Sequence, residues 1–269
     1  MRALSILGCI LLVACSQSTP VARNSGVYLL LDTSGTYRGE LRKAEDVILY
    51  TLSRLEPADS FAVARIDTGS FSEKDIIAKT TFDERPSVAN AQKRVFALKV
   101  KDFIARENAA QYTDITGGLL QAVEFLNEKG TGRKTILIFS DMEQDLDKGY
   151  MRDMQVPFEG FDVVALNVVK LRQDNYDPRQ YMARLEQWKG QVEKGGGHWR
   201  VVNDLDRLDG MLLEAGDGRA RAPQEVATQD RVPLAGARGR RHLRLRDVRH
   251  PGARTHLDRN LRLLEPNAR

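Results

Sequence analysis

Short apolar runs alternate with longer segments whose apolar residues recur at helical spacing, from residue 27 to residue 202. The run over 27–32 is almost continuously apolar, which is the pattern of a strand that is buried on both faces. Apolar residues between Leu41 and Leu55 follow one another at steps of three or four, which predicts one face of an amphipathic helix. This alternation predicts an α/β fold, a doubly wound and mostly parallel central sheet with helices on both faces.

The same two patterns predict the other elements of one domain, whose limits we place at residues 26 and 215. Further strands are expected at Phe61–Ile66, Ile76–Phe82, Thr135–Phe139, Val163–Val169 and Trp199–Val202. Further helices are expected over 87–103, around 119–126, from Asp177-Pro178 to about Gly195, and over 205–213. In the helix over 87–103, the expected apolar face consists of Val88, Ala91, Val95, Leu98 and Phe103 or residues near it.

Carboxylates and hydroxyls gather at the ends of these apolar runs. Asp32 ends the first run and is followed by hydroxyl groups at Ser34 and Thr36, while Asp141 follows a later run. Thr113 lies between them in a loop that leads into a helix. Ligands of an open parallel sheet bind beyond the carboxyl ends of its strands. Two carboxylates and three hydroxyls at that edge are all oxygen donors, the ligand type that hard cations such as Mg²⁺ prefer.

The segment D-T-S-G-T over residues 32–36, with the later Thr and Asp, resembles the metal-ion-dependent adhesion site of the von Willebrand factor A (vWA) domain. The motif of that family is Asp-x-Ser-x-Ser, a distant Thr and a distant Asp, and the resemblance covers about residues 26–215. It implies a site for Mg²⁺, or for Mn²⁺ or Ca²⁺, whose shell is completed by an Asp or Glu of a protein partner. The implied metal ligands are Asp32, Ser34, Thr36, Thr113 and Asp141.

Two residues depart from the pattern of the family. Thr36 replaces a Ser, which keeps the oxygen and adds a methyl group. Met142 stands where the family often has Gly, a change that can alter the shape of the third loop. Neither departure removes a ligand. Thr116, next to the start of a helix, is interpreted as a helix cap and not as a ligand.

Two other interpretations of residues 32–36 stay open. The segment also resembles the Asp-Lys-Thr-Gly-Thr phosphorylation motif of P-type pumps and the haloacid dehalogenase superfamily, which would make Asp32 a nucleophile. The soluble phosphatases of that superfamily carry a second Asp two residues later, where this chain has Ser34. Alternatively, a vWA-like scaffold holds no metal and these side chains only cap the connection from strand to helix. Because Ser34 stands where those phosphatases carry the second Asp, we predict a binding domain and not an enzyme.

The first 14 residues have the features of a secretory leader. Arg2 gives a basic start, and the apolar stretch of about 12 residues is shorter than the roughly 20 that span a bilayer. The segment L-V-A-C over residues 12–15 resembles the lipobox of bacterial lipoproteins, which implies a lipid on Cys15 and a tether over 15–25. With Ser16 after it, the implied location is the bacterial cell envelope, at the outer membrane and facing the periplasm. An ordinary cleaved secretory peptide stays open as the alternative.

The composition changes in the C-terminal tail, residues 216–269. Residues 217–269 hold 13 of the 29 arginines, none of the 12 lysines, and no Ile, Phe, Tyr or Trp. A segment without these core-forming residues predicts disorder or weak helix. A basic arm, an unstructured extension and translation of G+C-rich DNA in a shifted frame all stay open. Because the net charge of +4 arises in this tail, it does not indicate that the domain binds nucleic acid.

Overall fold

The computed structural model describes residues 24–203 except 36, 68, 107–108 and 150. Thr36 and Cys15 therefore lie outside the described residues. So do the leader, most of the tether, the helix expected over 205–213 and the tail over 216–269. Within the part of the chain that is described, every helix is too short or too polar to cross a lipid bilayer.

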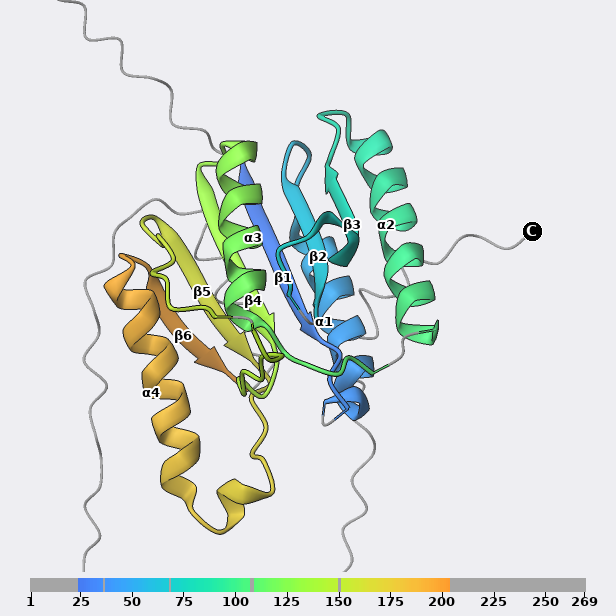
Figure 1. The fold of residues 1–269 in the computed structure, drawn as a ribbon. Coiled ribbons are helices and arrows are strands. Elements are labelled where there is room, and N and C mark those ends of the chain that lie inside the picture. The colour runs from blue at the N-terminus through green and yellow to red at the C-terminus, as the bar shows by residue number, and fades with distance from the viewer. Residues whose placement is uncertain (1–23, 36, 68, 107–108, 150, 204–269) are drawn as a thin grey trace, which may run out of the picture.

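A six-stranded sheet forms the centre of the domain, with the strand order β3-β2-β1-β4-β5-β6 (Figure 1). All neighbouring strands are parallel except the pair β2 and β3, so the predicted mostly parallel sheet is confirmed. The order reverses between β1 and β4, because β2 and β3 extend the sheet to one side and β4 to β6 extend it to the other. The strands are β1 Ser25–Asp32, β2 Ser60–Ile66, β3 Ile76–Thr81, β4 Arg133–Phe139, β5 Phe161–Leu166 and β6 His198–Val202.

Helices cover both faces of this sheet (Figure 1). Alternate residues of β1 point to opposite sides, as the pleat of a strand requires, and both sets are buried. Leu29 and Leu31 lie in the core that includes α1 and α2, whereas Tyr28 and Leu30 lie in the core that includes α3 and α4. The helices are α1 Leu41–Arg54, α2 Pro86–Arg106, α3 Ile115–Lys129 and α4 Pro178–Lys194, with short 3₁₀ turns η1 Arg38–Glu40, η2 Glu73–Asp75 and η3 Gln173–Asn175.

The predicted apolar face of α2 is wrong in part. Val95 and Leu98 are 54% and 65% exposed, and the helix buries Ala89, Lys93, Phe96 and Val100 instead. The Phe96 ring stacks on Phe61 of β2 with ring centroids 4.9 Å apart. This helix carries two apolar stripes at helical spacing. The stripe with the aromatic ring is the one that is buried, since a buried Phe removes more apolar surface from water than a Val or Leu.

Candidate metal centre at the switch point of the sheet

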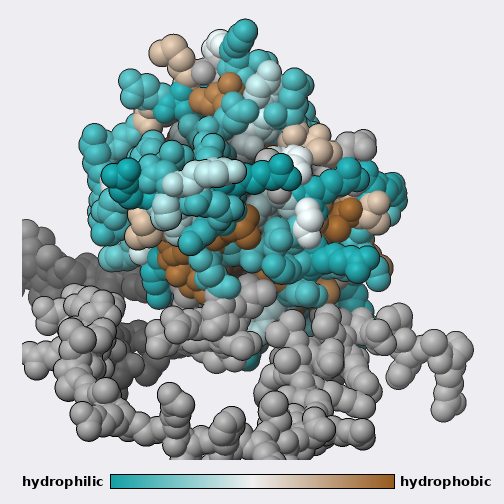
Figure 2. Space-filling view, turned by 90° about the horizontal axis from the view of Figure 1, so that it is seen from below, coloured by the Kyte–Doolittle hydropathy of each residue, from teal (hydrophilic) through white to brown (hydrophobic). Residues whose placement is uncertain are grey.

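The carboxyl ends of β1 and β4 lie side by side at the point where the strand order reverses. Leu31 of β1 is in register with Phe139 of β4, so Asp32 and Ser140 follow at adjacent strand ends. Crevices at such a switch point are the usual ligand sites of open α/β sheets. Seen from the carboxyl ends of the strands, the described surface is mainly hydrophilic with scattered small hydrophobic patches (Figure 2).

Asp32 is fully buried and connects the loops that follow these two strands. Its Oδ1 accepts a hydrogen bond from the backbone N–H of Ser34 at 2.8 Å, and its Oδ2 accepts one from Ser140 Oγ at 2.6 Å. Ser140 Oγ in turn accepts a hydrogen bond from the backbone N–H of Met142 at 2.9 Å. Burial raises the pKa of Asp32, and the hydrogen bonds from Ser140 and Ser34 lower it in part.

Three of the five predicted ligands line one cavity at this edge, with a volume of about 960 Å³. They are Ser34, Thr113 and Asp141, which come from three separate segments of the chain. Asp32 is fully buried and is not part of the cavity wall, and Thr36 is outside the described residues. The backbone of Thr113 is fixed by two hydrogen bonds with Asp145, at 2.7 Å and 3.0 Å. The structure thus brings together the three described loops that the sequence predicted to meet.

Asp141 is one of three carboxylates in the cavity wall, with Glu143 and Asp145, and it is only 3% exposed. Its Oδ1 accepts a hydrogen bond from the backbone N–H of Glu143 at 2.9 Å. The pKa of Asp141 is raised to about 6, chiefly by burial. The hydrogen bond from Glu143 and the charge of Arg184 lower this pKa in part, and the negative charge of Asp32 adds to its rise. Two buried carboxylates in this proximity repel each other when both are ionised, and a bound cation would offset that repulsion.

The donor set of this cavity fits a hard divalent cation. Hydroxyl and carboxylate oxygens are the ligands that Mg²⁺, Mn²⁺ and Ca²⁺ accept, and softer metals would favour His or Cys. Among the residues that the structure describes, no group of three or more His, Cys, Asp or Glu side chains could hold a metal ion. Hydroxyl groups would therefore have to supply part of any metal shell here, as Ser34 and Thr113 are positioned to do.

Thr116 belongs to the start of α3 and not to the cavity wall. Its backbone N–H and its Oγ1 both donate hydrogen bonds to Gln144 Oε1, at 2.9 Å and 2.7 Å. The capping residue of α3 is Asp114, whose Oδ1 accepts from the backbone N–H of Gly117 at 2.9 Å. Thr116 thus links α3 to the loop after β4.

Two side chains of α4 hold the loop after β4 in place. Arg184 Nε donates a hydrogen bond to the carbonyl oxygen of Asp141 at 3.0 Å, and Trp188 Nε1 donates one to the carbonyl oxygen of Met142 at 2.9 Å. Arg184 is also paired with the buried Asp174, with 2.8 Å between Nη2 and Oδ2. Met142 has a φ of 65°, a left-handed conformation that residues other than glycine rarely adopt. The two donors from α4 therefore stabilise a strained loop that carries Asp141.

The helical spacing of Trp188 from Leu185 and Val192 predicts a core position for its side chain, and the sequence does not single out Arg184. Trp188 is indeed buried, but it has a polar role as well, because its indole N–H reaches a loop 46 residues earlier in the chain. Arg184 lies on the buried side of α4, between the half-buried Tyr181 and Leu185. A charged residue on the apolar side of a helix is the signal that could have indicated a buried partner.

Comparisons with known proteins give structural similarity without close sequence similarity. No protein-family model matches the sequence. No curated protein matches it either. A von Willebrand factor type A structure from Catenulispora acidiphila is 13% identical, with a TM-score of 0.48, over 72% of this chain and 42% of that chain. The chain thus spans less than half the length of that structure.

Two further solved structures are similar to a comparable extent. An aerotolerance-related membrane protein from Bacteroides fragilis is 14% identical over 71% of this chain and 98% of that chain, with a TM-score of 0.39. The manganese-loaded TRAP protein of Plasmodium vivax is 13% identical over 75% of this chain and 65% of that chain, with a TM-score of 0.37. At these identities and TM-scores, the α/β assignment rests on the strand order of this chain itself.

Proposed function

We propose that this domain binds a protein partner through a divalent cation held in the cavity beyond the carboxyl ends of β1 and β4. The observation that carries the proposal is the meeting of Ser34, Thr113 and Asp141 in the wall of one cavity. Mg²⁺ is the proposed ion, with Mn²⁺ or Ca²⁺ as substitutes. Hard cations bound by few protein oxygens keep positions for outside ligands, and an Asp or Glu of the partner would fill one of them.

The same proposal includes no enzymatic activity. An attacking carboxylate has to reach the phosphoryl group, whereas Asp32 is fully buried and both its oxygens accept hydrogen bonds. The acid that soluble phosphatases carry two residues later is Ser34 in this chain. Phosphatase turnover that depends on Asp32 would contradict the proposal.

Lipid attachment at Cys15 would place the domain at the cell envelope, and we infer an outer-membrane location facing the periplasm.

Replacing Thr113 by Val is expected to weaken Mg²⁺ binding by about tenfold or more, because it removes one proposed ligand oxygen and keeps the shape of the side chain. Thermal unfolding with and without Mg²⁺ measures this, since a ligand at 100 times its Kd stabilises the folded protein by about 2.7 kcal/mol. Pull-down with wild type and with Thr113→Val as bait, each in Mg²⁺ or in EDTA, should recover the partner only with wild type in Mg²⁺.

Thr116→Val is the matched control for this experiment. It removes a hydroxyl only three residues away, which is bonded to Gln144 and does not line the cavity. We expect it to keep the Mg²⁺-dependent rise in melting temperature, although it loses a hydrogen bond worth about 1 kcal/mol. Equal Mg²⁺ responses of Thr113→Val and Thr116→Val would count against a metal at this cavity and favour a metal-free scaffold.

Mg²⁺ binding is also expected to weaken as the pH falls below about 6. The carboxylate form of Asp141 is the ligand, and its pKa in the metal-free folded protein is about 6. Protons therefore compete with the metal below that pH, and the apparent Kd for Mg²⁺ should rise toward tenfold per pH unit. Titrations at pH 7.5, 6 and 5 measure this, and a Kd that is constant across that range would exclude Asp141 as a ligand.

A further inference from the structure

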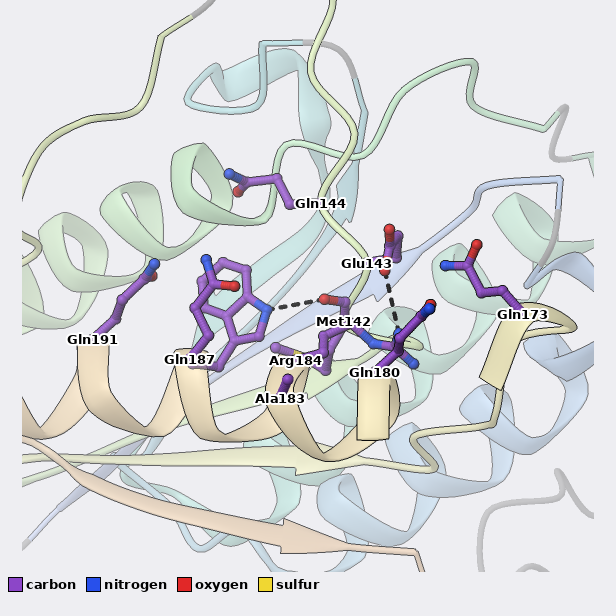
Figure 3. A pocket seen from close by; sticks show the side chains of 10 residues that line it. Met142, Glu143, Gln144, Gln173, Gln180, Ala183, Arg184, Gln187 and Gln191 are labelled. Carbon is purple, nitrogen blue, oxygen red and sulfur yellow. Dashed lines mark hydrogen bonds and ion pairs between the residues drawn. The ribbon is translucent and has the colours of Figure 1, made fainter. Parts of the chain in front are cut away.

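A second hollow lies next to the metal cavity, along α4. Its volume is about 430 Å³, and it shares Glu143 and Gln173 with the wall of the metal cavity, so the two hollows are adjacent. Trp188 and Met142 are among its lining residues and are themselves buried. We call it the amide groove because half of its ten lining residues are glutamines, namely Gln144, Gln173, Gln180, Gln187 and Gln191 (Figure 3).

Three of these glutamines form one ridge of α4. Gln180, Gln187 and Gln191 recur at steps of seven and four, which places them on the same side of a helix. Figure 3 shows their side chains rising from α4 toward the side on which Gln144 lies. All three are exposed, and their side chains make no hydrogen bond to any other residue that the structure describes. Their amide donors and acceptors therefore face the groove and solvent.

The other exposed positions of α4 have a different chemistry. They include the charged residues Arg179, Glu186, Glu193 and Lys194, whereas the ridge that borders the groove carries amides. Arg184 is the cation of the groove, and its charge is compensated by Asp174 at 2.8 Å and Glu143 at 3.3 Å. The amide groove is thus a nearly neutral surface rich in hydrogen-bonding groups.

Gln144, near the ridge, is held in a fixed orientation. Its Oε1 accepts two hydrogen bonds from Thr116, and its Nε2 donates to no residue in the described part of the chain. A side-chain amide offers both a donor and an acceptor, the same pair that a peptide group presents. An array of such amides can therefore bond to successive N–H and C=O groups of an extended main chain.

We propose that the amide groove binds an extended polypeptide segment of the same partner whose carboxylate completes the metal shell. This inference rests on the proposed function, because the carboxylate on the metal is what leads the segment onto α4. A phosphorylated or otherwise highly charged ligand would require uncompensated cations, and the described groove wall offers none. A sugar would bind best against an open aromatic face, but Trp188 is only 4% exposed.

The test uses the full chain and a displayed library of random twelve-residue peptides with one fixed central Asp, selected in the presence of Mg²⁺. Peptides that bind wild type are expected to bind Gln187→Ala/Gln191→Ala at least tenfold more weakly, because hydrogen bonds to the main chain are lost. N-methylation of peptide nitrogens on one side of the Asp should weaken binding to wild type. The Mg²⁺-dependent rise in melting temperature should be the same in both proteins.

Glu186→Ala/Glu193→Ala is the matched control, since it removes two exposed side chains of α4 that do not line the groove. It is expected to bind the selected peptides as wild type does. Mg²⁺-dependent peptides that bind the double glutamine variant with unchanged affinity would overturn the inference and leave the metal site intact. A library that yields no binder to a Mg²⁺-loaded protein would overturn it too. The absence of any Mg²⁺ response in wild type would instead contradict the proposed function itself.

Discussion

Replacing Arg184 by Leu is expected to lower the free energy of unfolding by about 3 kcal/mol, because the change leaves the carboxylate of Asp174 buried without its cation. The side chains of Arg184 and Asp174 are 8% and 0% exposed, and the guanidinium holds the pKa of Asp174 below its usual range. The substitution also removes the hydrogen bond from Arg184 Nε to the carbonyl oxygen of Asp141. Urea denaturation followed by tryptophan fluorescence measures the loss.

The pH dependence of that loss gives a second signature. A carboxyl group with a lowered pKa in the folded state stabilises the protein above its unfolded pKa, and this contribution disappears as the pH falls through the folded pKa. The difference between wild type and Arg184→Leu should therefore shrink on acidification below pH 4. Adding Asp174→Asn to Arg184→Leu should recover part of the stability, since the amide carries no charge to compensate.

Arg179→Leu is the control for this prediction. Arg179 lies on the same helix and is paired with Asp177 at 3.0 Å, but its side chain is 92% exposed. Exposed pairs of this kind contribute little, so the change should cost less than about 0.5 kcal/mol. Equal effects of the two substitutions would show that the pair of Arg184 and Asp174 does not behave as a buried one.

Replacing Asp141 by Asn is expected to stabilise the metal-free protein and to abolish its response to Mg²⁺. A carboxyl group whose folded pKa is about 6, against about 3.9 in the unfolded chain, binds its proton more tightly when folded. Wild-type stability should therefore fall as the pH rises from about 4 to about 7. Asn avoids this penalty, which is on the order of 2 kcal/mol at neutral pH, and its amide oxygen can still accept from Glu143.

The two effects of Asp141→Asn have opposite signs, which separates loss of the metal site from simple damage to the fold. Asp145→Asn is the matched control, since Asp145 lines the same cavity but is not among the proposed ligands. It should keep the Mg²⁺-dependent rise in melting temperature. An Asp141→Asn protein that responds to Mg²⁺ as strongly as wild type would contradict the proposed ligand set.

The sequence alone was sufficient to predict the strands and helices whose apolar patterns are unambiguous. The predicted runs that became β1 and β4 are buried, and for that reason Asp32 and Asp141 could be assigned to strand ends at one edge of the sheet. The face of α2 could not be chosen, because two apolar stripes compete on that helix. Periodicity does not measure which stripe meets an aromatic partner such as Phe61.

The sequence predicted which loops meet at the candidate site, and it predicted less of how their residues are arranged. The motif treats Asp32 and Asp141 alike as ligands. In the structure, Asp32 is buried and accepts hydrogen bonds from two loops, while Asp141 lines the cavity. The contributions of Arg184 and Trp188 depend on contacts more than 40 residues away in the chain. Such contacts follow from the packing of α4 on the sheet and leave no local pattern in the sequence.

The most direct measurement of the central claim is an electron paramagnetic resonance titration of the full chain with Mn²⁺, in which bound ions lose the signal of free aqueous Mn²⁺. The proposed site predicts saturation at one Mn²⁺ per chain, displacement of that ion by excess Mg²⁺, and no such binding by Asp141→Asn. A signal of free Mn²⁺ that rises in proportion to the added ion from the first addition, in wild type at neutral pH, would contradict the account.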